Sequence, residues 1–125
     1  MAKTLTDYLL RASLAEETVL SLPVATSIFG YWAQQIVEKL LNALLSENGK
    51  ELHRIHNLRR IRRNVEAIGE KLPPLSYPVE LLTLYATTYR YKPPPPMPDA
   101  ERQQIRDAVR ILREHVQARI AALRA

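Results

Sequence analysis

The chain contains no cysteine and only three glycines among its 125 residues. Without cysteine it can form no disulfide bond and no thiolate metal site, which is compatible with a reducing compartment. The glycines do not form the pattern of a phosphate-binding loop. No serine, histidine and acid set stands in a recognisable nucleophilic motif either. These absences argue against a disulfide-stabilised secreted domain, a glycine-loop nucleotide hydrolase and a serine hydrolase.

The chain also has no apolar run that approaches the roughly 20 residues of a membrane span. Its first residues do not combine a basic start with an apolar stretch and a small-residue cleavage site. We therefore expect a cytoplasmic protein without membrane contact. With 125 residues, of which 46% are hydrophobic, we expect a single domain over residues 1–125. The net charge of +5 favours an anionic partner such as RNA, a nucleotide or an acidic protein.

Apolar residues at helical spacing predict a first helix from residue 4 or 6 to about residue 21, since Pro23 cannot continue it. Glu16 and Glu17 are expected to face outward on this helix. A second helix should begin with Thr26 or Ser27 as its N-cap and end at Asn48-Gly49. Its wide apolar stripe predicts that it is the central helix of a bundle. The stripe consists of Trp32, Ile36, Val37, Leu40, Leu41, Leu44 and Leu45.

A third helix should begin near Leu52 or His56 and end at Gly69, and it includes Ile55 in its apolar stripe. A fourth helix can start at Pro78, because proline is favoured in a first turn. Its apolar positions are Val79, Leu81, Leu82, Leu84 and Tyr85, and it should end in the cluster Tyr89-Arg90-Tyr91.

The four prolines at 93–96 predict an extended connector over about residues 92–98. A last helix should follow, with Asp99 as its cap. Its apolar positions are Ile105, Val109, Leu112, Val116, Ile120 and Leu123. No segment reads as a strand, so the predicted fold is an all-α, four- or five-helix up-and-down bundle with antiparallel neighbours.

The second predicted helix carries polar residues that a core stripe does not require. Gln34-Gln35 and Glu38-Lys39 precede the leucine-rich stretch 40–45, and an aromatic-rich lead-in, 29–32, comes before them. This order resembles the signature helix of the HEPN family. Members of that family are small helical bundles, many of which bind nucleotides or cleave RNA and work beside a minimal nucleotidyltransferase.

Two further segments resemble the same family. Residues 53–58 are similar to a His, spacer and His-Asp-Leu motif, with Asn57 in place of the acid. Arg90-Tyr91 is similar to an Arg-Tyr-Pro motif, although Lys92 separates it from Pro93. The resemblance implies a nucleotide- or RNA-binding protein that acts with a minimal nucleotidyltransferase, as in toxin–antitoxin pairs, and that forms a homodimer.

Residues 50–63 are strongly basic, with six arginines and lysines against one acid, Glu51. On a helical wheel, Arg59, Arg60 and Arg63 fall opposite the apolar stripe and form one solvent-facing ridge. Together with His53 and Arg54 they are the candidate nucleic-acid-binding residues. The alternatives are a merely solvated face or a protein interface. His53 and His56 could stack on a base, titrate near neutral pH or close the helix start, but they lack a third metal ligand beyond Glu51, and we expect no metal.

Arg110 and His115 have the spacing of the catalytic pair in HEPN ribonucleases. Histidine could transfer a proton while arginine stabilises the charged phosphate, without a metal. Five helical residues turn the chain by about 500°, so the two side chains point about 140° apart on a straight helix. A kink or a second subunit would have to unite them. Ile111 also replaces the polar residue that usually follows the arginine in the family.

Three hypotheses remain open. The first is a HEPN-like nucleotide- or RNA-binding protein with a nucleotidyltransferase partner. The second is a metal-independent endoribonuclease toxin that uses Arg110 and His115. The third is a protein-interaction module whose surface includes Tyr89 and Tyr91. None of them requires a cofactor.

Overall fold

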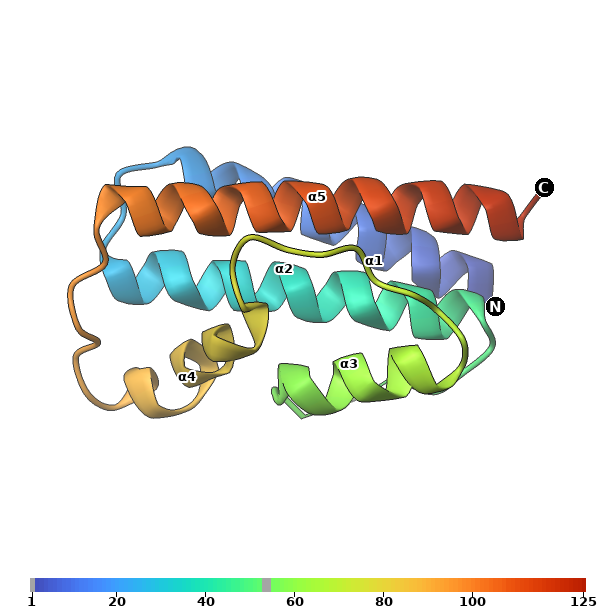
Figure 1. Ribbon diagram of the computed structural model, residues 1–125, viewed down its shortest axis with the longest axis horizontal. Helices are drawn as coiled ribbons and strands as arrows, with labels where there is room; N and C mark the ends of the chain where they lie inside the picture. Colours follow the sequence, from blue (N-terminus) through green and yellow to red (C-terminus); the bar gives the residue numbers. More distant parts are fainter. Residues whose placement is uncertain (1, 53–54) are drawn as a thin grey trace.

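The computed structural model describes residues 2–52 and 55–125 (Figure 1). Within these residues it contains helices and no strand, which confirms the predicted all-α class. The α-helices are α1 (Ala2–Glu17), α2 (Thr26–Glu47), α3 (Leu58–Ala67), α4 (Thr83–Ala86) and α5 (Asp99–Leu123). Short 3₁₀ helices are η1 (Thr18–Ser21), η2 (Val79–Leu82) and η3 (Thr88–Arg90). No helix in the described part of the chain is long and apolar enough to cross a membrane.

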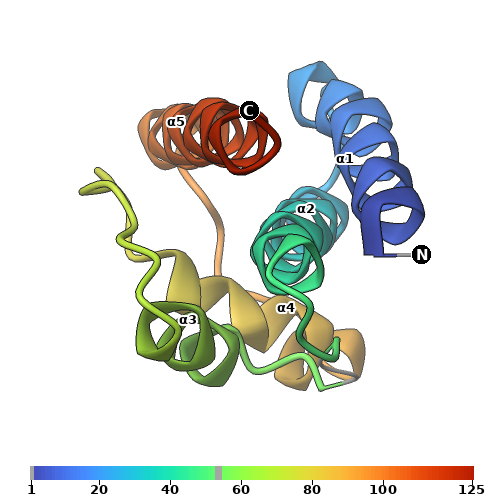
Figure 2. The same ribbon diagram turned by 90° about the vertical axis from the view of Figure 1, so that its right-hand side faces the viewer.

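Helix α2 lies at the centre, with α1, α3, α4 and α5 around it (Figure 2). Six of the seven residues of the predicted stripe are fully buried and form part of the core, whereas Trp32 is only partly buried. Burial on several sides is what a helix with such a broad apolar surface requires. The second helix is therefore central, as predicted.

Helices α1 and α2 run in opposite directions, as expected of neighbours joined by a short connection. The Thr6 hydroxyl donates to Ser46 Oγ at 3.0 Å, and Lys39 Nζ lies 3.0 Å from Glu16 Oε2. Glu17 Oε1 accepts from Arg113 Nε of α5 at 2.8 Å. The expectation that Glu16 and Glu17 face outward is thus wrong, because both carboxylates are partly buried between helices.

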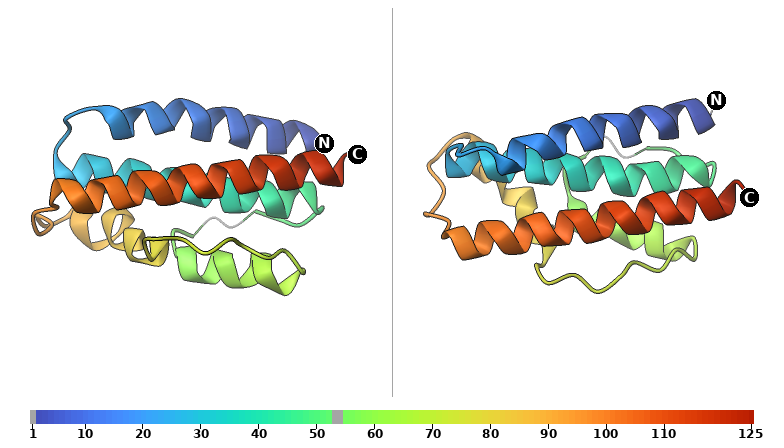
Figure 3. Two further views of the ribbon diagram at one scale, coloured as in Figure 1. Left: turned by 45° about the horizontal axis from the view of Figure 1, so that its top comes forward. Right: turned by 90° about the horizontal axis from the view of Figure 1, so that it is seen from above.

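Helix α5 runs parallel to α2, and not antiparallel to it. Near the start of both helices Arg102 Nη1 donates to the Val24 carbonyl at 2.8 Å, and near their ends Arg124 Nε lies 2.7 Å from Glu47 Oε2. The long connection that contains η2, α4 and η3 returns the chain to the end where α2 begins, so α5 can repeat the direction of α2 (Figure 3). The two termini therefore lie at one end of the bundle.

Helix α3 also runs parallel to α2. His56, just before α3, contacts Glu38 in the middle of α2, and Glu70, just after α3, accepts from Asn48 Nδ2 at 3.2 Å beyond the end of α2. The chain must therefore return along α2 before α3 begins. This return explains why α3 starts at Leu58 and the predicted starts at Leu52 or His56 are too early.

Asn57 is the N-cap of α3, and its side chain accepts from the backbone N–H of Arg60 at 3.1 Å. Ile55, which the sequence placed in the helical stripe, lies outside the helix and is exposed. The helix ends at Ala67, two residues before Gly69, whose φ of +93° suits glycine and ends the helical conformation.

The expected N-caps of α2 and α5 are wrong by one or two residues. Ala25 and Pro98 occupy the cap positions, and neither side chain makes a capping hydrogen bond. The Pro98 carbonyl accepts from the N–H groups of Glu101 and Arg102, and the fixed φ of proline presets the turn. Thr26 and Asp99 are instead the first residues of their helices.

The predicted fourth helix is divided into η2, α4 and η3. Val79, Leu82 and Tyr85 are buried, whereas Leu81 and Leu84 are exposed. Ala86 is buried as well, and side chains three, six and seven residues apart share a face in an α-helix too, so burial alone does not separate the two geometries. The sequence pattern overestimated the length of the α-helix, of which only Thr83–Ala86 is present.

Candidate nucleic-acid interface

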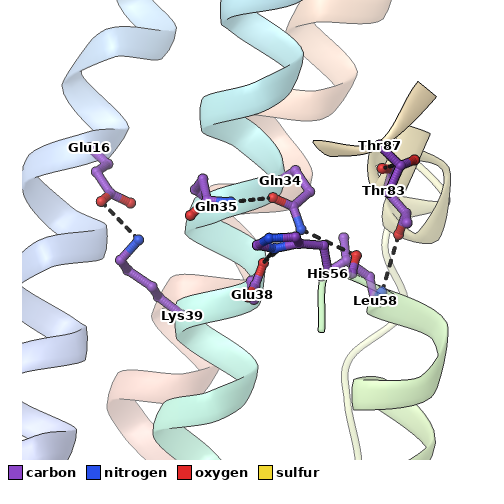
Figure 4. Close-up of polar contacts among 9 residues, drawn as sticks. All are labelled: Glu16, Gln34, Gln35, Glu38, Lys39, His56, Leu58, Thr83 and Thr87. Carbon is purple, nitrogen blue, oxygen red and sulfur yellow. Dashed lines mark hydrogen bonds and ion pairs between the residues drawn. The ribbon is translucent and has the colours of Figure 1, made fainter. Parts of the chain in front are cut away.

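Three polar residues of the signature in α2, Gln34, Gln35 and Glu38, form a connected network with His56 (Figure 4). The Gln34 side chain is fully buried, and its Nε2 donates to Glu38 Oε2 at 2.8 Å and to the His56 carbonyl at 3.4 Å. Gln35 Nε2 donates to Gln34 Oε1 at 2.7 Å. A buried amide needs hydrogen-bond partners, and Glu38, four residues after Gln34 on the same helix, supplies one.

This network and two separate contacts tie α2 and α3 to their neighbours. His56 Nδ1 lies 2.9 Å from Glu38 Oε2, and Lys39 pairs with Glu16 of α1. The first backbone N–H of α3, at Leu58, donates to Thr83 Oγ1 of α4 at 3.1 Å. The four signature residues thus join α1, α2 and the segment that leads into α3, and Gln34 is buried while the other three are partly exposed: Gln35, Glu38 and Lys39.

The arginine ridge, which we define as Arg59, Arg60 and Arg63, lies on the exposed face of α3. None of its guanidinium groups makes an ion pair with another residue of the described ranges. Arg62, on the flank of the same helix, does pair, with Glu80 of η2 and with Glu66. The other two predicted contributors, His53 and Arg54, lie outside the described residues.

Most arginines at the C-terminal end of the chain have structural partners. Arg102 and Arg106 donate to backbone carbonyls before α2, at 2.8 and 2.9 Å, and both guanidinium groups lie over the Phe29 ring. Three others bind carboxylates on other elements: Arg113 with Glu17, Arg119 with Glu70, and Arg124 with Glu47 and Asp7. These cations hold α5 to the bundle and are therefore not available to a ligand.

Arg110 differs from these tethers. Its only ion pairs in the described structure are with Asp107 and Glu114 of α5 itself, at 3.5 and 3.4 Å, and all three side chains are about half exposed. Such exposed pairs contribute little stability, so Arg110 can exchange them for another partner.

His115 lies on the opposite flank of α5 from Arg110. Arg110 follows Arg106 and precedes Arg113, which face α1 and η1, whereas His115 lies near Arg119, which faces Glu70. Because α5 is continuous over 25 residues, the helix does not bring Arg110 and His115 together within one chain. The Nε2 atom of His115 is buried and has no hydrogen-bond partner among residues 2–52 and 55–125.

A hollow that sequence reasoning missed lies where α2 begins, beside α4 and η3. It has a volume of about 310 Å³ and continues into a second hollow of about 420 Å³, with which it shares Ser27, Tyr89 and Arg90. We call the two together the aromatic groove. Its chief lining side chains are Tyr31, Trp32, Tyr85, Tyr89, Arg90 and Lys92. The two aromatic clusters were visible in the sequence, but nothing in it showed that they meet.

Glycine at position 30 allows this meeting. A Cβ added to Gly30 would lie only 2.2 Å from a ring carbon of Tyr85, so the ring packs directly on the backbone of α2. Tyr85 lies 5.0 Å from Tyr89 between ring centroids, and the Arg90 guanidinium lies 5.9 Å from the centroid of Tyr31. Burial raises the pKa of the Tyr85 hydroxyl.

Two other perturbed groups lie away from these sites. Burial, reinforced by the negative charge of Glu101, raises the pKa of Tyr77 to about 12. The hydrogen bond from Arg124 lowers the pKa of Glu47. Among the residues that the structure describes, no three histidine or acidic side chains gather where they could hold a metal ion.

Comparison with known proteins agrees with the geometry of α2 and its neighbours. A family model described as the HEPN domain matches residues 24–120, which include α2, α3, α4 and nearly all of α5. No curated protein and no solved structure matches the chain. The chain therefore belongs to the HEPN domain family, whose role is related to nucleotides or RNA at the level of the family.

Proposed function

We propose that this protein binds RNA through the arginine ridge and acts with a minimal nucleotidyltransferase, as in a toxin–antitoxin pair. The observation that carries the proposal is the contrast between two sets of arginines. Those of α5 are mostly paired across the bundle, whereas Arg59, Arg60 and Arg63 are exposed without an ion pair in the described ranges. Three adjacent free guanidinium groups suit a phosphate backbone, which they contact at little cost in lost internal bonds.

Binding of this kind is mainly electrostatic and releases counterions from the RNA. The logarithm of the affinity then falls with the logarithm of salt concentration, by about 0.7 for each phosphate contacted on a single strand. Replacing Arg59, Arg60 and Arg63 by glutamine should weaken binding of a labelled mixed-sequence RNA and reduce this slope by roughly 2. Fluorescence anisotropy at several salt concentrations measures both quantities.

The matched control removes the same charge elsewhere, by changing Lys3, Arg11 and Lys71 to glutamine. These side chains are exposed and belong to no ion pair described in the structure. If the control weakens binding as much as the ridge variant does, net charge accounts for the affinity and the ridge is not the site. Equal salt slopes in the wild type and the ridge variant would also contradict the proposal.

The proposed partner and assembly rest on the resemblance to the HEPN family and need their own test. We propose a cytoplasmic homodimer that forms a complex with a nucleotidyltransferase encoded beside it. Co-expression of the two chains followed by size-exclusion chromatography with light scattering should give one peak that contains both. Separate elution, or the absence of a neighbouring nucleotidyltransferase gene, would contradict this part.

A second candidate function is metal-independent RNA cleavage by Arg110 and His115. Two observations favour it: the ion pairs of Arg110 stay within α5, and Nε2 of His115 lacks a hydrogen-bond partner in the part of the chain that the structure describes. Since the two side chains lie on opposite flanks of α5, this activity requires that a second subunit supply one of them.

A further inference from the structure

We propose that the aromatic groove binds a nucleoside phosphate, with the base against its aromatic rings and the phosphate at Arg90 and Lys92. The proposal rests on the proposed function for the class of ligand, but it assigns a site separate from the arginine ridge. The ligand could be a free mononucleotide or one nucleotide of an RNA strand, because the groove would recognise the same chemistry in both.

The walls of the groove suit a flat apolar ring. Tyr31, Trp32 and Tyr89 are partly exposed, so parts of their rings remain open to a ligand. Tyr31 and Trp32 meet nearly at right angles, with their planes 82° apart, and thus offer surfaces in two directions. Nucleobases stack on aromatic side chains in this way with little regard to sequence. A volume of about 310 Å³ also falls in the usual range for small-ligand sites.

The floor of the groove is held in place from below. Tyr85 is buried and packs directly on Gly30, inside a helix where glycine is otherwise unfavourable. Glycine lowers the stability of this helix relative to alanine, but only glycine leaves room for the Tyr85 ring at this position. The groove is therefore preformed, and binding would not have to pay for ordering its floor.

The charge of the groove selects an anion. Arg90 and Lys92 are exposed, and no acidic side chain lines either hollow. Arg90 makes no ion pair with a residue of the described ranges and lies over the Tyr31 ring, so its guanidinium plane can extend a stack and still donate to phosphate. Aromatic faces beside free cations favour a base joined to a phosphate over an acidic peptide, which would offer charge without a flat ring.

The single tryptophan makes the test direct, because Trp32 is the only one in the chain and lines the groove. Its fluorescence is excited at wavelengths where adenine does not absorb, and AMP is added. We expect saturable quenching that ribose 5-phosphate and inorganic phosphate do not reproduce at equal concentration. No saturable change with AMP would overturn the proposal, as would equal binding of inorganic phosphate. Preferential binding of an acidic peptide in place of AMP would also overturn it.

Two groove variants and a control locate the site. Arg90→Gln and Tyr89→Leu should each weaken AMP binding about tenfold, as the loss of one phosphate contact or one stacking surface would. Tyr8→Leu changes an exposed tyrosine of α1, far from the groove lining, and should leave binding unchanged. Circular dichroism confirms that each variant is folded. AMP binding that survives both groove changes, or is lost equally in the control, would place the nucleotide elsewhere.

The ridge variant separates this proposal from the proposed function. With Arg59, Arg60 and Arg63 changed to glutamine, AMP should still quench Trp32 with wild-type affinity, and loss of that quenching would overturn an independent site. A short oligoadenylate tested on the same variant distinguishes the two sources of ligand. If the oligonucleotide binds with a lower dissociation constant than AMP, the groove is assigned to an RNA strand. If it binds with a higher dissociation constant, the groove is assigned to the free mononucleotide.

Discussion

Nδ1 of His56 lies 2.9 Å from Oε2 of Glu38, and the same carboxylate oxygen accepts from Nε2 of Gln34 at 2.8 Å. Glu38 thus joins a fully buried amide of α2 to the segment that leads into α3. This contact fixes where the chain resumes after it returns along α2, and hence where the arginine ridge begins. The signature of the second helix therefore positions the candidate interface without forming it.

Replacing Glu38 by alanine should destabilise the fold. The change leaves Gln34 Nε2 and His56 Nδ1 without their shared acceptor, and a buried group deprived of its partner costs about 1–3 kcal/mol. Urea unfolding followed by circular dichroism measures the loss. His56→Ala should cost less, because Gln34 keeps its bond to Glu38, and the double variant should show that the two changes are not additive.

The matched control for this prediction is Glu114→Ala. It also removes a glutamate from a helix, but from an exposed position whose one ion pair is with Arg110. Its free energy of unfolding should stay within about 0.5 kcal/mol of the wild type. If Glu38→Ala behaves like the control, the network does not stabilise the bundle.

Gly30→Ala should destabilise the protein although alanine is the better helix former. Helix propensity favours alanine by about 1 kcal/mol, whereas a Cβ 2.2 Å from the Tyr85 ring must displace that ring, and overpacking typically costs about 1–3 kcal/mol. In a Tyr85→Ala background the clash is absent, so the same glycine change should become stabilising. The change in thermal unfolding midpoint caused by Gly30→Ala is measured in the wild type and in the Tyr85→Ala background. A stabilising effect of Gly30→Ala in the wild type would show that Tyr85 does not pack on the backbone of α2.

RNA cleavage, if it occurs, should persist in a chelator and fall about 10²–10⁴-fold in Arg110→Ala and His115→Ala. Because these residues lie on opposite flanks of α5, activity shared between subunits predicts that a mixture of the two inactive variants regains part of the wild-type rate. A gel assay with a labelled RNA pool measures it. Arg119→Ala removes a neighbouring structural cation and serves as the control. Unchanged cleavage in either variant, or none in the wild type, would reject this activity.

Stability should decline at alkaline pH partly through Tyr77. The pKa of this residue is raised to about 12 in the folded state, against about 10 in the unfolded chain. Its contribution is therefore fully present below pH 10 and is lost as pH rises toward 12, because only the unfolded state releases the proton. The wild type should lose up to about 1.4 kcal/mol per pH unit more than Tyr77→Phe in this window. The free energy of unfolding of both proteins is measured by circular dichroism in urea between pH 9 and pH 11. If it falls equally in both over this range, the assignment is contradicted.

The helices predicted best from the sequence are the long ones, α2 and α5, in which apolar residues recur at helical spacing many times. Over α2 and α5 the apolar stripe recurs for 22 and 25 residues, so one misread position does not alter the outcome. The shorter segments were predicted less well. For η2, α4 and η3 the difference between 3₁₀ and α geometry depends on tertiary packing around Tyr85, which no local pattern records.

Some features of the candidate site were likewise predictable from the sequence, and others were not. The helical wheel placed Arg59, Arg60 and Arg63 on one exposed face, because opposite faces of one helix follow from its period alone. The wheel also separated Arg110 from His115 for the same reason. By contrast, only the folded chain showed which arginines are paired, since their partners, such as Glu17 and Glu70, are far away in the sequence.

By itself, the sequence determined the all-α class, the central place of α2 and the family to which the chain belongs. These properties follow from periodicity and from motifs within a single helix. The tertiary structure decided the parallel direction of α3 and α5, the burial of Gln34 and the meeting of Tyr31 with Tyr89 and Arg90. Each of these depends on contacts between segments distant in the chain, and the free energy of such contacts is set only when the whole bundle packs.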